Sequence, residues 1–134
     1  MYLTKRNTAQ IKDFEKYGNV TVTSDNGEAV RQSDILIFAV QPGHFEAILF
    51  DIKEFLKENH VIISTITGFS IARMESVVGN DKYIIRSMPN TAISVGKSKH
   101  CICCNGLGKK RVDLAKAIFT RMGQSMEIPE AQMQ

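Results

Sequence analysis

Three turns of small and polar residues each follow a short apolar run, and their composition suits the binding of a polar ligand. They are Gln41-Pro42-Gly43, Thr67-Gly68-Phe69-Ser70 and Pro89-Asn90-Thr91. Proline fixes the backbone, and glycine permits an unusual torsion or the close approach of a ligand. Amides at the start of a helix suit a phosphate or a carboxylate, and side-chain amides and hydroxyls can hydrogen-bond a carboxamide or a carboxylate. Ordinary structures explain the same residues without a ligand: a tight strand-to-helix connection, a capped helix start and an Asx turn.

A basic segment, Thr4-Lys5-Arg6-Asn7, follows the first expected strand. After the second strand of a dinucleotide-binding fold, an acid holds the ribose hydroxyls of NAD, whereas basic residues accommodate the 2′-phosphate of NADP. The first acid in this chain is Asp13. If residues 1–4 form that second strand, Lys5 and Arg6 predict a preference for NADP, although exposed lysine and arginine are also ordinary surface residues.

The strongest strand signals are three runs of near-continuous apolar residues, at positions 34–40, 60–66 and 82–88. Apolarity on both faces of a strand is typical of a parallel sheet that is covered by helices on each side. Weaker strands are expected at residues 1–4, 20–23, 99–103 and 125–128.

Segments with helical spacing lie between these strands. Apolar residues three and four apart predict helices over residues 44–57 and 114–122, and a further helix is expected over residues 8–17. Asp25 and Ser70 are candidate N-caps of two more. The alternation of strand and helix predicts a doubly wound α/β sheet, in which ligands bind beyond the carboxyl ends of the strands.

Composition restricts the class of protein. The chain has 134 residues, of which 43% are hydrophobic and 23% charged, and its net charge is +3. These values fit one ordinary globular domain without a bilayer-spanning segment. The basic charge is diffuse, so we expect neither a nucleic acid nor a membrane as partner. We expect the protein to be cytoplasmic.

Three cysteines, Cys101, Cys103 and Cys104, lie beside His100. Their odd number argues against a disulfide framework. A zinc site usually separates its ligands more widely and adds a second distant pair, which this sequence lacks. We therefore expect reduced, half-buried cysteines on a strand, and no metal.

Several segments resemble successive motifs of the pyrroline-5-carboxylate reductases, in the same order and spacing. The most specific runs from Arg86 through Ser87-Met88-Pro89-Asn90-Thr91 to Gly96. Two others, Ala39-Val40-Gln41-Pro42 and residues 63–71, are weak signals when taken alone. Residues 25–30 and 130–133 are also similar to family segments, so the resemblance covers nearly the whole chain.

The resemblance implies an NAD(P)H-dependent reduction of the imine of 1-pyrroline-5-carboxylate to L-proline, with NADPH as cofactor and NAD possible. It implies that Lys5 and Arg6 hold the 2′-phosphate and that Asn26 lies at the adenosine ribose. The diphosphate and nicotinamide side would be held by Ala39, Val40, Gln41, Pro42, Thr65, Ile66 and Thr67, and the nicotinamide pocket lined by Met88, Pro89 and Asn90. It assigns no catalytic residue.

The chain departs from the family pattern in two substitutions and at both ends. Gln41 stands where a lysine is usual, which removes a charge beside the cofactor, and Ala92 stands where a second proline is usual. The sequence contains no GxGxxG-like motif. We therefore interpret residues 1–134 as a truncated NADP-binding Rossmann-like domain, incomplete at the N-terminus and without the helical domain that forms the dimer in the family.

The strand expected to be missing is central in the order 3-2-1-4-5-6, so its two neighbours should have unpaired edges. A rearranged sheet, an element exchanged in a homo-oligomer or a fragment of a longer chain would each account for this. Three functions remain open: a reductase domain that needs further segments for turnover, a non-catalytic nucleotide-binding remnant or interaction module, and a related NADP-dependent reductase of another substrate.

Overall fold

Five strands form the main sheet of the protein, in the order β3-β4-β5-β6-β7. The computed structural model describes residues 1–89, 98–120 and 123–132. β3, β4 and β5 run parallel, β6 is antiparallel to β5, and β7 is parallel to β6. The sheet is therefore mostly parallel, as the sequence predicted. The strands span Ile35–Phe38 (β3), Val61–Ser64 (β4), Tyr83–Pro89 (β5), Ser98–Cys104 (β6) and Gly123–Glu127 (β7).

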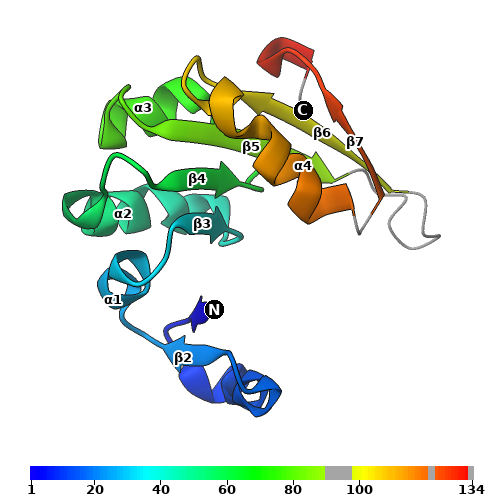
Figure 1. Cartoon of the computed structure of the whole chain (residues 1–134). Coiled ribbons are helices and arrows are strands. Elements are labelled where there is room, and N and C mark those ends of the chain that lie inside the picture. The colour runs from blue at the N-terminus through cyan, green and yellow to red at the C-terminus, as the bar shows by residue number, and fades with distance from the viewer. Residues whose placement is uncertain (90–97, 121–122, 133–134) are drawn as a thin grey trace.

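Helices cover both faces of this sheet, so the doubly wound prediction is confirmed. α2 (Pro42–Ile52) and α3 (Ile71–Val78) lie on one face, and α4 (Val112–Thr120) lies on the other (Figure 1). β4 is buried along its whole length, and its side chains alternate between the two cores. Ile62 joins the core under α2 and α3, whereas Val61 and Ile63 join the core under α4.

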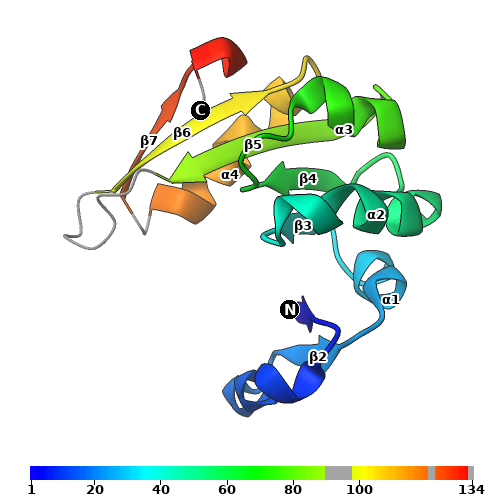
Figure 2. The ribbon, with the colours of Figure 1, turned by 180° about the vertical axis from the view of Figure 1, so that it is seen from behind.

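A second, smaller sheet is formed by β1 (Tyr2–Thr4) and β2 (Thr21–Thr23), which are parallel. It lies below the main sheet in Figure 2, and α1 (Asn26–Arg31) connects the two. Among the described residues, β1 pairs with β2 alone and β3 with β4 alone. The expected unpaired edges are thus present, and β1 and β3 do not pair with each other to close the sheet.

His60 connects α1 to the start of β4. Its imidazole is 2% exposed, and its Nδ1 accepts a hydrogen bond of 2.7 Å from the amide of Lys57. The proton therefore lies on Nε2, which donates to the carbonyls of Val30 at 3.0 Å and Ser33 at 2.8 Å. This buried side chain therefore ties the end of α1 and the residues just after it to the start of β4.

The segment over residues 8–17 differs from the helix that the sequence predicts. It forms two 3₁₀ turns, η1 (Thr8–Gln10) and η2 (Lys12–Tyr17), and none of their residues is buried. Its apolar residues Ile11, Phe14 and Tyr17 are three apart, which aligns them on a 3₁₀ helix but not on an α-helix. Without a core to pack against, this short segment lacks what stabilises α-helices in proteins.

The other helix predictions are confirmed within the described residues, with small shifts at the ends. The helix expected over residues 114–122 corresponds to α4, which begins at Val112, and residues 121–122 lie outside the described part of the chain. The helix expected over residues 44–57 begins at Pro42 and ends in a 3₁₀ turn, Lys53–Phe55. Asp25 caps α1 by accepting from the amide of Glu28 at 3.1 Å, and Ser70 caps α3 by accepting from Arg73 at 3.2 Å. None of the helices in the described part of the chain is long and apolar enough to cross a membrane.

Candidate functional site

The carboxyl ends of β3, β4 and β5 meet at one edge of the main sheet. The register places Phe38, Ser64 and Arg86 side by side on the three strands. Thr65 fixes two of these ends together, because its amide and its hydroxyl both donate to the carbonyl of Phe38, at 3.1 and 2.9 Å. The segments that follow β3 and β4, Ala39–Pro42 and Thr65–Thr67, are therefore neighbours, as the sequence predicted.

The turn after β3 presents the start of α2 to solvent. Ala39, Val40, Gln41 and Pro42 are all exposed, and Pro42 is the first residue of α2. Gln41 is the N-cap, but its side chain makes no capping hydrogen bond. Gly43 has no positive φ, and a Cβ added there would meet nothing within 4 Å. The unusual torsion considered for Gly43 is therefore wrong, and close approach of a ligand remains the prediction for this glycine.

The turn after β4 is formed partly by core residues. Gly68 has a φ of 78°, a conformation that favours glycine. Thr67 is exposed, but Ile66 is only 3% exposed and belongs to the core under α2 and α3. The side chain of Ile66 therefore packs the fold. Its amide donates to Oγ of Ser64 at 3.2 Å and its carbonyl accepts from Nη2 of Arg86 at 3.4 Å, so the cofactor contact expected of Ile66 stays a prediction.

The third predicted segment lies at the end of β5. Met88 is half-buried, and Pro89 is still part of the strand, where it lies opposite His100 of β6. Asn90, which the family resemblance places at the nicotinamide, lies outside the described residues. The contact predicted for Asn90 stays a prediction.

Lys5, Arg6 and Asn26 follow the strands of the smaller sheet. Because β1 and β2 are parallel with Thr4 opposite Thr23, Lys5 and Arg6 follow one carboxyl end, and Asn26 follows the other. Lys5 and Arg6 are exposed, and neither side chain forms an ion pair within the described residues. Both cations are thus available to a phosphate, although no hydrogen bond ties them to the edge of the main sheet.

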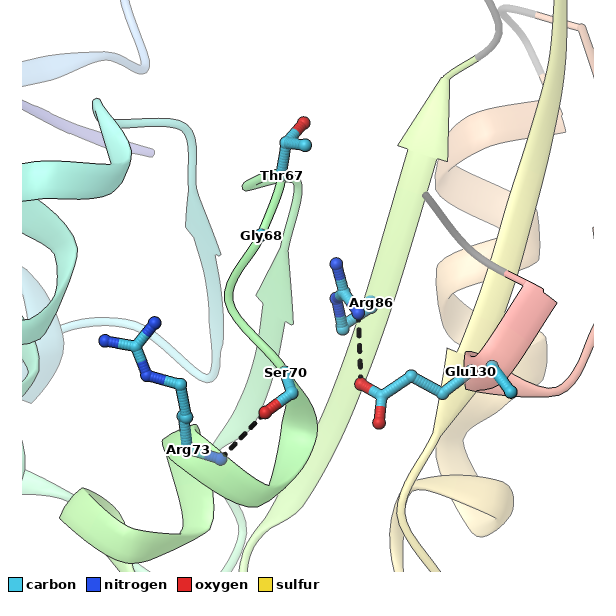
Figure 3. A pocket seen from close by; sticks show the side chains of 7 residues that line it. Thr67, Gly68, Ser70, Arg73, Arg86 and Glu130 are labelled. Carbon is cyan, nitrogen blue, oxygen red and sulfur yellow. Dashed lines mark hydrogen bonds and ion pairs between the residues drawn. The ribbon is translucent and has the colours of Figure 1, made fainter.

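A surface pocket of about 710 Å³ opens beside this edge. Figure 3 shows the guanidinium of Arg86 between the turn at Thr67 and the carboxylate of Glu130, with Ser70 at the start of α3 below. Arg73, Arg86 and Glu130 have no role predicted from the sequence. Arg86 and Glu130 did lie within the segments that resemble the reductase family, which was the available signal. The lining residues are Thr67, Gly68, Ser70, Arg73, Arg86, Glu130 and Ala131.

The three cysteines lie on β6, and none of them forms a disulfide bond within the described residues. Burial raises the pKa of the Cys103 thiol to about 11, with a further contribution from Glu130 and an opposing one from Arg86. Burial also raises the pKa of Cys104. Both thiols are therefore protonated at neutral pH, which makes them unsuited to nucleophilic chemistry.

His100 gives the fold a predicted dependence on pH. It is 2% exposed, its ring stacks on that of Phe119 in α4 with 4.8 Å between the centroids, and neither ring nitrogen has a hydrogen-bond partner in the part of the chain that the structure describes. Burial lowers its pKa below the ordinary 6.5. In acid the unfolded chain therefore binds a proton at His100 more readily than the folded chain does. The stability that neutral His100 contributes is fully present above its unfolded-state pKa of 6.5 and falls as the pH decreases through that value.

We expect the free energy of unfolding, measured by urea titration from pH 7.5 to 5, to fall by up to about 1.4 kcal/mol per pH unit through this one group. His100→Gln should flatten this slope. Equal slopes in both proteins would contradict the assignment of the effect to His100. The comparison therefore isolates the contribution of His100 from the rest of the pH dependence.

Comparison with known proteins agrees with this arrangement. The family described as "NADP oxidoreductase coenzyme F420-dependent" matches residues 1–68. Pyrroline-5-carboxylate reductase 1 of Dictyostelium discoideum is 34% identical over 98% of this chain, which spans 26% of that protein. A solved pyrroline-5-carboxylate reductase of Coxiella burnetii superposes with a TM-score of 0.85 at 24% identity, over 96% of this chain and 48% of that one. A solved Plasmodium falciparum pyrroline carboxylate reductase with NADP bound superposes with a TM-score of 0.77, also at 24% identity, over 98% of this chain and 58% of that one.

The sheet, its helices and its carboxyl edge define a domain of the Rossmann-like class. The chain belongs to the family described as "NADP oxidoreductase coenzyme F420-dependent", and it is a domain similar to those of the pyrroline-5-carboxylate reductases. It spans from about a quarter to just over half of the length of the relatives named above.

Proposed function

We propose that the chain is the nucleotide-binding domain of a reductase that converts 1-pyrroline-5-carboxylate to L-proline with NADPH, and that turnover requires further segments of such an enzyme. The observation that carries the proposal is the shared edge, where exposed turns follow two adjacent parallel strands. In open α/β sheets this edge is where ligands bind. The names of the similar proteins support the choice of substrate.

The residues present fit one part of a dinucleotide site. The exposed backbone from Ala39 to Pro42 opens α2, and amides at the start of a helix suit phosphate oxygens. Gly68 allows close approach in the neighbouring turn. Met88 is half-buried on the next strand and would offer an apolar contact to the nicotinamide.

When bound, the cofactor supplies a hydride for the imine carbon, so the task of the protein is binding and orientation. Lys5 and Arg6 would bind the 2′-phosphate, and Asn26 would hydrogen-bond the adenosine ribose. The rigid link between Thr65 and Phe38 would keep the two turns at a fixed distance from each other. No described residue is assigned a proton-transfer role.

Cofactor choice gives the first test of this proposal. The double variant Lys5→Ala with Arg6→Ala should lower the affinity for NADPH by about tenfold, equivalent to ~1.4 kcal/mol, because it removes two cations from the 2′-phosphate. NADH carries no 2′-phosphate, so its affinity should not change. The measurement is nicotinamide fluorescence in a titration of the purified chain.

The matched control is Lys12→Ala with Lys16→Ala, which removes two exposed cations from η2 and should leave both affinities unchanged. Absence of a saturable signal at millimolar NADPH in the wild type would contradict nucleotide binding. Equal losses for NADPH and NADH in the first variant would contradict the role of Lys5 and Arg6.

A non-catalytic nucleotide-binding or interaction module is the second candidate, and the unpaired edges of β1 and β3 favour it. An assay of 1-pyrroline-5-carboxylate reduction separates the two candidates. If the chain binds NADPH saturably but shows no turnover, even when a helical domain of the family is added, the result supports the non-catalytic module. Turnover of a different imine or carbonyl substrate would support a related reductase. A cytoplasmic location, a homo-oligomer and the absence of a nucleic-acid partner stay predictions.

A further inference from the structure

A carboxylate from a distant part of the chain lies at the start of α3. Glu130, in the 3₁₀ turn η6 (Glu130–Gln132), accepts a hydrogen bond of 2.7 Å from the amide of Ile71. The same oxygen, Oε2, accepts from Nη1 of Arg86 at 3.0 Å. Ile71 is the first residue of α3, so its amide has no partner within the helix. Glu130 thus occupies an oxyanion site that a helix amide and an arginine form together.

The hydrogen-bond donors of Arg86 are only partly matched by acceptors at this site. Its side chain is 5% exposed. Among the described residues its Nε has no hydrogen-bond partner, and its Nη2 donates only to the carbonyl of Ile66, at 3.4 Å. A buried guanidinium is stabilised when its donors are matched by acceptors, and carboxylates often match two at once. One oxygen of Glu130 therefore leaves part of the binding capacity of Arg86 unused.

The surroundings leave room for a ligand. Arg86 and Glu130 line the pocket of about 710 Å³ together with the hydroxyls of Thr67 and Ser70. Figure 3 shows that the guanidinium faces the Thr67–Ser70 turn and that Glu130 reaches it from the opposite side. Arg73 lies at the outer wall, where it is half-exposed and pairs with Glu46 at 3.2 Å. Glu130 itself is 33% exposed, so its carboxylate can turn out into water without crossing the core.

We propose that this pocket binds the carboxylate group of a small ligand, and that Glu130 is an internal occupant which the ligand displaces. The external carboxylate takes the amide of Ile71 and the guanidinium of Arg86, and Glu130 moves into solvent. No nucleotide takes part, so the proposal goes beyond the proposed reductase function and does not depend on it. Because Glu130 is tethered, it competes at an effective concentration in the millimolar range, and the ligand binds the wild type weakly.

Acetate is the probe for this site. In the ¹⁵N-labelled full chain, titration with sodium acetate should move the amide resonance of Ile71 saturably, whereas sodium chloride at equal ionic strength should not. Glu130→Ala removes the competing carboxylate, so its acetate affinity should be at least about tenfold higher than that of the wild type. Glu130→Gln, which keeps the size of the side chain, should also bind acetate more tightly.

Glu127→Ala is the matched control. It also removes one carboxylate from the C-terminal part of the chain, where Glu127 pairs with Lys109 and Lys116, and it lies outside the pocket lining. Its acetate affinity should equal that of the wild type. A similar gain in Glu127→Ala would show a general effect of net charge and would overturn the assignment of the site.

The wild type decides the proposal even if the Glu130 variants do not fold. An Ile71 amide that does not respond to acetate in the wild type would show that Glu130 is a permanent structural link, and this would overturn the proposal. A saturable response in the wild type that Arg86→Lys weakens, at unchanged unfolding midpoint, would support it, since lysine keeps the charge but loses the planar fork.

Discussion

Replacing Phe45 with alanine is expected to lower the free energy of unfolding by about 4 kcal/mol, within the range typical of buried phenylalanines. Phe45 is fully buried on α2, and its ring lies 5.2 Å from that of Phe38 and 4.7 Å from that of Phe69. Truncation removes both aromatic contacts and leaves a cavity that this sheet-helix layer cannot close. A loss of this size is a large fraction of the stability of an ordinary domain.

The same change should also weaken the cofactor edge. Phe38 ends β3 directly before the turn at Ala39–Pro42, and Phe69 lies in the turn before α3. The packing of the three rings therefore helps to hold both turns in position. Urea unfolding gives the stability, and NADPH fluorescence at a temperature where the variant is folded gives the affinity, which we expect to fall several-fold. Phe50→Ala is the control on the same helix, because Phe50 is 50% exposed, and it should change stability by less than about 1 kcal/mol. Equal losses in the two variants would contradict the role given to the aromatic cluster.

The fold was predictable where burial is visible in the sequence. β4 is buried on both faces, so its apolar run is continuous and identifies a central strand of a covered sheet. Asp25 and Ser70 were identifiable as caps because aspartate and serine are residue types whose side chains commonly accept hydrogen bonds from the first helical amides. Residues 8–17 were mispredicted because helical spacing was read without knowing that no core would cover the segment.

The candidate site was predictable only in part, for a related reason. Turns that follow parallel strands must meet at one edge, so the neighbourhood of Ala39–Pro42 and Thr65–Thr67 followed from the order of elements. Whether a side chain in such a turn points outward does not follow, and Ile66 points into the core. The pair of Arg86 and Glu130 joins positions 44 residues apart, and it depends on how the C-terminal segment crosses the sheet. No local spacing encodes that contact.

Replacing Gly108 with alanine is expected to destabilise the domain by about 3 kcal/mol, at the upper end of the cost of overpacking. Asn105 organises this loop: its Oδ1 accepts from the amides of Ile84 at 3.2 Å and Gly108 at 2.6 Å, and its Nδ2 donates to the carbonyl of Lys82 at 2.8 Å. The loop is therefore held so close to β5 that a Cβ on Gly108 would collide with the backbone carbonyl of Ile84. A backbone atom within a sheet cannot move aside as the end of a flexible side chain can.

Gly106 provides the control for this prediction in the same loop. A Cβ there would meet nothing within 4 Å, and the φ of Gly106 is not positive. Gly106→Ala should therefore be neutral or stabilise the domain by up to about 1 kcal/mol, because alanine lowers the conformational entropy of the unfolded chain. Both variants can be compared by urea unfolding at neutral pH. If the two changed stability equally, the close approach at Gly108 would not be what constrains this loop. A loss of stability confined to Gly108→Ala would instead mean that the connection between β6 and α4 depends on two features. These are the hydrogen bonds of the Asn105 side chain and the lack of a Cβ at Gly108.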